Sequence, residues 1–293
     1  MYKNLLYNEA LNSNWFNSIS VYGPQDLDDE FKTRFKDILN LPRGSGYWIW
    51  KVYIINKKLD EIKEGDILIY LDAGCTINKK GERRFYEYID VLNNNNEGII
   101  SFNMSLAEKV WTTTEIFNYF NISTNSQITN SGQFHSTILI MKKNNNLINI
   151  IKNYYKILYT NPLLFTDYYN NNQQNYFIDN RHDQSVFSIL RKLYGSIILN
   201  DETWFQPFGN ISSLAYPFWG QEEEKYKYLC SYCFIVLLFY KTIKYMLLKA
   251  KCWILCYFIK INNIGCIYRI NIIIKIKFHK SGYICIKTTY NIF

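Results

Sequence analysis

Cysteine, histidine and acidic residues are few or unevenly spread along the 293 residues of this chain. Residues 1–224 hold one cysteine, Cys75, which excludes a disulfide framework there and suits a reducing compartment. Residues 225–293 contain no Asp or Glu, but hold 12 of the 33 Lys and Arg residues and six of the seven cysteines. The net charge of +8 therefore combines about −4 in residues 1–224 with about +12 in the tail.

This asymmetry removes the general argument for nucleic-acid binding, because the larger part of the chain is mildly acidic. We therefore expect no nucleic-acid partner. No signal peptide is expected, since Met1–Tyr7 lacks the apolar stretch of about 7–15 residues that such a segment needs. Together with the single cysteine of residues 1–224, this predicts a cytoplasmic protein.

Long hydrophobic runs are also missing from the tail. The apolar run Leu229–Tyr240 is 12 residues long, short of the ~20 that a spanning helix needs. A basic, aromatic-rich segment fits a helix lying on a membrane surface, so residues 225–293 predict a membrane-surface partner. The pairs Cys230 with Cys233 and Cys252 with Cys256 suggest zinc, but the spacing of the second pair and the hydrophobic surroundings are poor for a structural zinc site. Residues 271–293 resemble translated AT-rich sequence, and an altered reading frame is our hypothesis for the tail.

Apolar periodicity predicts alternating strands and helices over residues 1–220. Ile67–Leu71 is an unbroken apolar run, which is typical of a strand buried on both faces. The other expected strands span residues 15–22, 98–102, 137–141 and 196–199, and the main expected helices span residues 2–12, 26–39, 47–63, 79–92, 147–159 and 183–194. This order predicts an α/β domain, residues 1–220, with a mainly parallel sheet flanked by helices, followed by the tail, residues 221–293.

The first motif with functional residue types is a glycine-rich turn before a helix. Gly44–Gly46 frees backbone N–H groups, and Arg43 and Lys51 lie on either side. Such a segment suits a phosphate or diphosphate, and these residues are predicted to bind one. The alternative is a simple loop whose following aromatic residues, Tyr47 and Trp48, pack in the core.

The second motif, Asp72-Ala73-Gly74, directly follows the strand Ile67–Leu71. Open α/β sheets bind ligands beyond the carboxyl ends of their strands. A carboxylate at this place can hold Mg²⁺ or Mn²⁺ against a diphosphate. Asp72 is therefore a predicted metal ligand, and the alternative is a turn cap, because Asp-x-Gly is ordinary turn chemistry.

Two further polar turns come later in the chain. Ser131-Gly132-Gln133 enters a strand and by itself indicates an ordinary turn. Arg181-His182-Asp183-Gln184 opens an amphipathic helix, and His182 or Asp183 can act there as a general base, a metal ligand or an acceptor from a sugar hydroxyl. A helix N-cap would explain Asp183 but not its three polar neighbours.

Taken together, five segments resemble glycosyltransferases of the nucleotide-diphospho-sugar transferase (GT-A) superfamily, as found in giant viruses and polysaccharide-producing bacteria. They occur in the order Gly44–Lys51, Tyr70–Gly74, Ser131–Gln133, Arg181–Ser185 and Asp201–Trp204. The resemblance covers about residues 10–219.

The resemblance implies a Rossmann-like GT-A fold, a nucleotide-sugar donor, a glycan or protein acceptor and a divalent cation. Asp72 stands at the Asp-x-Asp position, where Gly74 replaces the second acid. Asp183, with His182 beside it, matches the acid that faces the sugar ring and is the predicted catalytic residue. The remaining residues expected to bind the donor are Arg43, Gly44, Gly46, Lys51, Ala73, Ser131, Gly132 and Gln184.

Two other interpretations stay open. The strand that holds the nucleotide base in such domains is not found ahead of the strand expected at residues 15–22, so an inactive relative that has lost donor binding is one. A metal-dependent phosphoesterase using Asp72, His182 and Asp183 is the other, although three histidines in the chain supply few ligands for it. The polar loop of residues 161–180 is predicted to contact an acceptor.

Overall fold

The structure is a computed structural model that describes residues 2–203, 211–220, 275–278 and 284–287. The chain divides into two compact units, Met1–Leu238 and Phe239–Phe293. In the second unit, β8 (Lys275–Phe278) and β9 (Ile284–Lys287) form an antiparallel hairpin. The predicted boundary at residue 220, the membrane-surface contact and the reading-frame hypothesis fall mostly outside the described residues and stay predictions.

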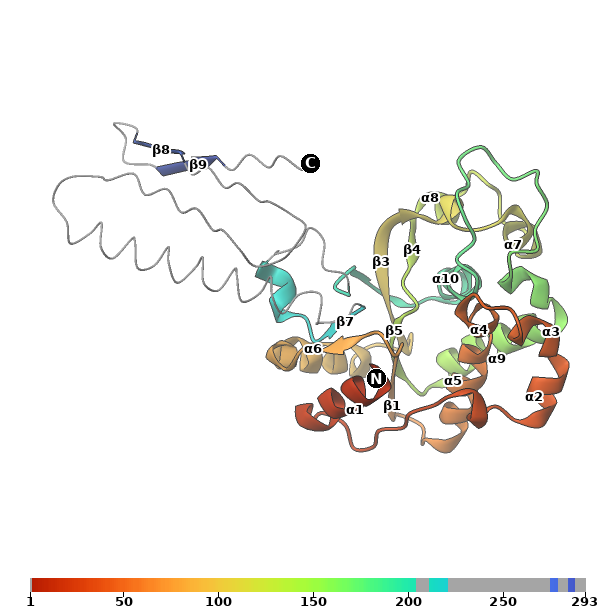
Figure 1. The fold of residues 1–293 in the computed structure, drawn as a ribbon, viewed down its shortest axis with the longest axis horizontal. Coiled ribbons are helices and arrows are strands. Elements are labelled where there is room, and N and C mark those ends of the chain that lie inside the picture. The colour runs from red at the N-terminus through yellow and green to blue at the C-terminus, as the bar shows by residue number, and fades with distance from the viewer. Residues whose placement is uncertain (1, 204–210, 221–274, 279–283, 288–293) are drawn as a thin grey trace, which may run out of the picture. The chain divides into compact units, whose positions relative to one another are not determined.

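A five-stranded mixed sheet forms the centre of the first unit (Figure 1). Its strands are β1 (Ile67–Leu71), β3 (Ile99–Ala107), β4 (Gly132–Phe134), β5 (Ile138–Lys142) and β6 (Ile197–Asn200). β5 pairs antiparallel with both β1 and β3, β4 pairs antiparallel with β3, and β6 pairs parallel with β3. Two short strands, β2 (Thr76–Ile77) and β7 (Phe218–Trp219), form a separate antiparallel pair.

Strands and helices alternate, so the predicted α/β class holds, but the prediction of a mainly parallel sheet is wrong. Among the described strands of this sheet, only β3 and β6 pair in parallel. An apolar run indicates that helices cover the strand. It does not indicate whether the neighbouring strand is parallel or antiparallel, because the burial is the same in both cases. Because β5 runs back between β1 and β3, these two strands point the same way without pairing.

Helices cover both faces of the sheet, which creates two hydrophobic cores (Figure 1). On one face lie α5 (Trp50–Glu61), α9 (Asn145–Thr160) and α10 (Asp183–Tyr194), and on the other lie α1 (Tyr2–Ser13) and α6 (Glu82–Asn93). Alternation along β5 serves both: Leu139 and Met141 enter the first core, and Ile138 and Ile140 enter the second. The shorter helices are α2 (Asp29–Arg34), α3 (Lys36–Leu39), α4 (Gly44–Tyr47), α7 (Thr114–Tyr119) and α8 (Gln127–Asn130).

Three predicted elements differ in the structure. The helix expected over residues 26–39 is divided at Phe35, whose backbone leaves the helical region (φ −106°, ψ 19°). The helix expected from Tyr47 begins at Trp50. The strand expected over residues 15–22 is absent: Trp15 and Phe16 pack on Phe85 of α6, and the Trp15 and Phe85 ring centroids are 4.6 Å apart.

The strands β4 and β5 lie along the same edge of β3, and residues 135–137 interrupt them. Asn103 lies opposite Phe134, whereas Ile100 lies opposite Ile140, so three steps along β3 face six steps along its neighbour. The extra residues turn towards the end of β1, where the Asp72 backbone N–H donates to the Thr137 carbonyl at 3.0 Å. This interruption places the Ser136 and Thr137 carbonyls beside the carboxyl end of β1.

Candidate functional site

Lys51, in the first turn of α5, extends to the carboxyl end of β1. Its side chain is 4% exposed, and its ammonium lies 2.8 Å from Asp183 Oδ2 and 3.5 Å from Asp72 Oδ1. It also donates a hydrogen bond to the Ser136 carbonyl at 3.1 Å. Burial alone would lower the pKa of Lys51, but the two carboxylates raise it, so the ammonium stays charged. Lys51, Asp72 and Asp183 are called the lysine–carboxylate cluster below.

Asp72 is the most exposed member of this cluster, with 24% of its side chain accessible. Its Oδ1 accepts a hydrogen bond of 2.5 Å from the Tyr70 hydroxyl, two residues earlier in β1. Burial, then the Asp72 charge, raises the pKa of Tyr70, so this hydroxyl remains a donor. Around Gly74 there is open space: a Cβ there would have nothing within 4 Å. The Asp72 carboxylate is thus held by Tyr70 and Lys51 and remains partly accessible.

Asp183 begins α10 and is 4% exposed. Burial raises its pKa, and the neighbouring Lys51 charge partly offsets that rise. The Tyr154 hydroxyl donates to the Asp183 backbone carbonyl at 3.1 Å, which fixes the start of α10 against α9. With two acids and one ammonium, the cluster carries a formal charge of −1.

The interruption between β4 and β5 is held by side chains from α10. The Ser136 N–H donates to Gln184 Oε1 at 3.0 Å, and the amide of Gln184 donates to Gln133 Oε1 at 2.7 Å. The fully buried Arg191 donates to the carbonyls of Phe134 and His135 and to the Ser136 hydroxyl. These contacts fix the carbonyl that Lys51 uses.

The segment Gly44–Trp48, which includes α4, forms a left-handed turn that precedes α5 and lies against the start of α10. All five residues of Gly44–Trp48 have positive φ, between 50° and 90°. The Tyr47 ring stacks on His182 with centroids 4.7 Å apart, and the Trp48 ring lies 5.7 Å from it. His182 itself has φ 52° and ψ −117°. Strained backbone conformations at residues other than glycine are found at functional sites more often than elsewhere.

Gly46 shows how closely this turn packs, and it supplies a test. A Cβ at Gly46, where φ is +90°, would lie 2.7 Å from Leu39 Cα and 2.9 Å from the Ile38 carbonyl oxygen. We expect Gly46→Ala to lower the free energy of unfolding by about 2–4 kcal/mol, through strain and overlap. The matched control is Gly74→Ala, where a Cβ meets nothing. Urea unfolding measures both, and equal stability of the two variants would contradict the expectation.

Arg43 lies beside this turn but is committed to acids of the loop between α9 and α10. Its guanidinium contacts Asp179 at 2.5 Å and Asp167 at 3.3 Å. Asp167 Oδ1 also lies 2.8 Å from His182 Nε2. Burial lowers the pKa of His182, partly offset by Asp167. Arg43 therefore joins the turn to this loop, and its predicted contact with a phosphate stays a prediction.

The predicted residues fall into three groups. Lys51, Asp72 and the pair Asp183 and Gln184 come together, although they belong to three separate predicted motifs. Arg43, Gly44 and Gly46 lie at the neighbouring turn, and His182 packs against that turn from the start of α10. Ala73 and Gly74 continue the chain after Asp72. Ser131 and Gly132 lie at the far end of β4, where Ser131 Oγ donates to the Ile128 carbonyl at 2.8 Å and Gly132 pairs with Ala107.

His135, Tyr70 and Asp167 lie at or next to the site, yet sequence reasoning did not single them out. His135 is 8% exposed, and within the described part of the chain its Nδ1 makes no hydrogen bond. Burial lowers the pKa of His135 to about 4, with opposing effects from Asp201 and Lys51. The only sequence signal for it was its place two residues after Gln133.

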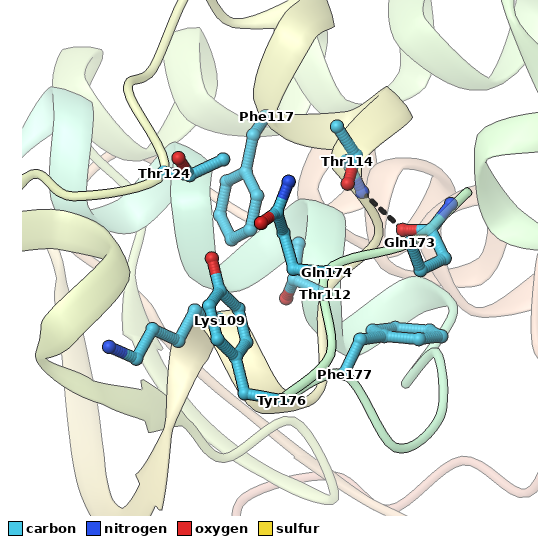
Figure 2. Close-up of a pocket in the computed structure, with 9 residues that line it drawn as sticks. All are labelled: Lys109, Thr112, Thr114, Phe117, Thr124, Gln173, Gln174, Tyr176 and Phe177. Atoms are coloured by element: carbon cyan, nitrogen blue, oxygen red, sulfur yellow. Dashed lines mark hydrogen bonds between the residues drawn. The ribbon is translucent and has the colours of Figure 1, made fainter.

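The loop predicted to contact an acceptor packs back on α7 and on the 3₁₀ turn Glu108–Val110. Figure 2 shows Gln173 pointing at α7, where its Oε1 accepts from the Thr114 N–H at 2.8 Å. The Glu115 carboxylate accepts from the Asn170 N–H at 2.9 Å and from the Gln173 amide at 2.8 Å. The loop's polar side chains thus serve first to hold the loop in place.

The side chains available as metal ligands fit a cation that is also coordinated by water and by a bound phosphate. In the part of the chain that the structure describes, no group of three or more His, Cys, Asp or Glu side chains is placed to hold a metal ion. Mg²⁺ commonly binds through one or two carboxylates together with waters and substrate phosphates. Asp72, which is partly exposed, can supply one such carboxylate.

No protein-family model, curated protein or solved structure matches this chain. Within the described residues, no helix is both long and apolar enough to cross a membrane. The fold and site together define a mixed α/β protein with a buried lysine and two acids at the carboxyl end of β1, a strand at the edge of the described sheet.

Proposed function

We propose that this protein is a glycosyltransferase with a GT-A-like fold, which uses a nucleotide-diphosphate-sugar donor and a divalent cation. The observation that carries the proposal is the convergence of Lys51, Asp72 and Asp183. These residues come from three segments far apart in the sequence, each included in the resemblance. A carboxylate oxygen of Asp72 and one of Asp183 lie within 3.5 Å of the Lys51 ammonium.

The cluster's charge sets how the donor would bind. A formal charge of −1 repels a diphosphate that arrives alone. A divalent cation held by Asp72 would neutralise the negative charge on the diphosphate leaving group. Lys51 forms ion pairs with Asp72 and Asp183 and fixes the direction of both carboxylates. The catalytic roles expected for Asp183 and His182 stay predictions, because the two residues are 4% and 1% exposed.

This proposal predicts that cation and nucleotide bind together. In thermal unfolding with a panel of uridine and guanosine diphosphates, we expect a rise in melting temperature only when Mn²⁺ is also present. At a ligand concentration 100-fold above Kd, stabilisation of about 2.7 kcal/mol corresponds to a rise of about 5–10 °C. EDTA should abolish it, as should Asp72→Asn.

Asp60→Asn is the matched control, because Asp60 is an exposed carboxylate on the same helix as Lys51. It should keep the full rise. An equal rise in Asp72→Asn would remove Asp72 from the site. The absence of a response to every nucleotide would favour the inactive relative over the transferase.

A further inference from the structure

An open groove lies beside the start of the loop between α9 and α10. It has a volume of about 440 Å³, within the range of ~300–1,000 Å³ found for small-molecule sites. Its apolar and aromatic walls include Pro162, Leu163, Tyr168 and Tyr169. Leu163 is 56% exposed and Tyr168 is 64% exposed, although both are large hydrophobic side chains. None of the proposed donor-binding residues lines this groove.

The wall of the groove is preformed by its own hydrogen bonds. Thr166, which is 1% exposed, donates its hydroxyl to the Leu163 carbonyl at 2.8 Å and accepts from the Tyr168 N–H at 3.1 Å. The Asn180 amide donates to the Thr166 carbonyl at 3.0 Å. Tyr169 packs edge-on against Phe177, with ring centroids 5.3 Å apart. A wall fixed in this way loses little conformational entropy when a ligand binds.

One lining residue also retains an unused acceptor. Asn180 is 1% exposed, and its Oδ1 makes no hydrogen bond to any described residue. A buried acceptor without a partner destabilises the folded protein. A hydroxyl donor that reached it would recover this free energy.

The same segment connects the groove to the lysine–carboxylate cluster. Asp167 lies between Thr166 and Tyr168 in the chain, and its carboxylate lies 2.8 Å from His182 Nε2. His182 directly precedes Asp183. The groove wall and the proposed site therefore share one continuous set of contacts.

The chemistry of the lining selects the class of ligand. No Lys or Arg occurs among the lining residues, so the groove offers no charge to a phosphate or other anion. Its one acid, Glu115, is engaged by Asn170 and Gln173. Exposed tyrosine faces beside hydroxyl and amide groups suit a ring with apolar C–H faces and hydroxyl edges. We propose that this groove binds a neutral saccharide, which, given the proposed function, is the acceptor.

Saturation-transfer NMR with a panel of neutral di- and trisaccharides tests this proposal on the full chain. We expect transfer to at least one of them, and a Kd about fivefold to tenfold weaker in Tyr168→Ala, since one ring contact is worth about 1 kcal/mol. Tyr86→Ala is the matched control: Tyr86 is 51% exposed on α6 and does not line the groove. It should bind like the wild type.

Three results would overturn the groove proposal: no binding of any saccharide, equal binding by Tyr168→Ala, or displacement of the saccharide by an alkyl-chain detergent below its micellar concentration, which would indicate an apolar ligand. The proposed function fails separately. Saccharide binding without any nucleotide response would leave a carbohydrate-binding groove on a protein that is not a transferase. A nucleotide response retained in Tyr168→Ala would show that the donor site is independent of the groove.

Discussion

Lys51→Met is expected to lower the free energy of unfolding by about 3–5 kcal/mol, since it leaves the Asp183 carboxylate buried without its cation. The Ser136 carbonyl would lose its donor in the same substitution. Urea unfolding at pH 7 measures the loss. Methionine keeps the length of the stem, so a cavity contributes little to the expected effect.

A second ion pair on the same helix provides the control. Lys58 lies 2.8 Å from Glu61, the same separation as Lys51 from Asp183, but the two side chains are 20% and 47% exposed. Lys58→Met should cost less than about 1 kcal/mol, because exposed ion pairs contribute little. The double variant Lys51→Met with Asp183→Asn should regain part of the lost stability. Equal midpoints for the two single lysine variants would contradict this account of the cluster.

The loss in Lys51→Met should also shrink as the pH falls. Burial raises the folded-state pKa of Asp183 above its ordinary value of 3.8, even with Lys51 present. At pH values between 3.8 and the raised folded-state pKa, Asp183 is protonated in the folded state and ionised in the unfolded state. Stability therefore falls as the pH rises through this window. Without Lys51 the window extends upward, so the variant should approach the wild type between pH 7 and pH 4.

The elements that sequence patterns predicted well are those with strong apolar periodicity. The helices expected over residues 147–159 and 183–194 appear as α9 and α10, and the strand expected at Ile67–Leu71 is β1. Its expected burial on both faces is wrong, because β1 pairs only with β5, lies at the edge of the described sheet and is half-buried. Asp72 was expected at the carboxyl end of a strand, and Asp183 at the start of a helix, since each follows or opens a periodic element. Their shared contact with Lys51 was not expected, because Lys51 was assigned to a phosphate.

What the sequence could not predict depends on contacts between distant segments. Arg43 reaches acids 124 and 136 residues away, so no local pattern could show that its charge was already paired. The direction of β5 and the interruption at residues 135–137 also depend on contacts between segments that are distant in the sequence, so no local pattern could predict them. Gly44–Gly46 signalled a turn, but the left-handed conformation continues through Tyr47 and Trp48, where local preference opposes it.

Arg191→Met is the other substitution expected to have a large effect, about 3–5 kcal/mol in the free energy of unfolding. Arg191 is 0% exposed, and burial lowers its pKa to about 9, so it is still charged at pH 7. Removing the guanidinium charge also removes the free-energy cost of burying it, which by itself would stabilise the folded state. However, the carbonyls of Phe134 and His135 would then be buried without donors, at about 1–3 kcal/mol each. Methionine has no hydrogen-bond donor and satisfies neither carbonyl, so the loss of these hydrogen bonds outweighs the gain.

The substitution should also reach the proposed donor site, because Arg191 holds the residues that Lys51 and Gln184 use. We expect faster hydrogen exchange at the His135 and Ser136 amides in Arg191→Met, together with a smaller nucleotide-dependent rise in melting temperature. Arg83→Met is the matched control: Arg83 is 94% exposed and pairs with Glu87 on α6, and its loss should change stability by no more than about 0.5 kcal/mol. Unchanged exchange at residues 135–136 in Arg191→Met would mean that the break between β4 and β5 is fixed by the sheet itself, and that Arg191 only fills the core.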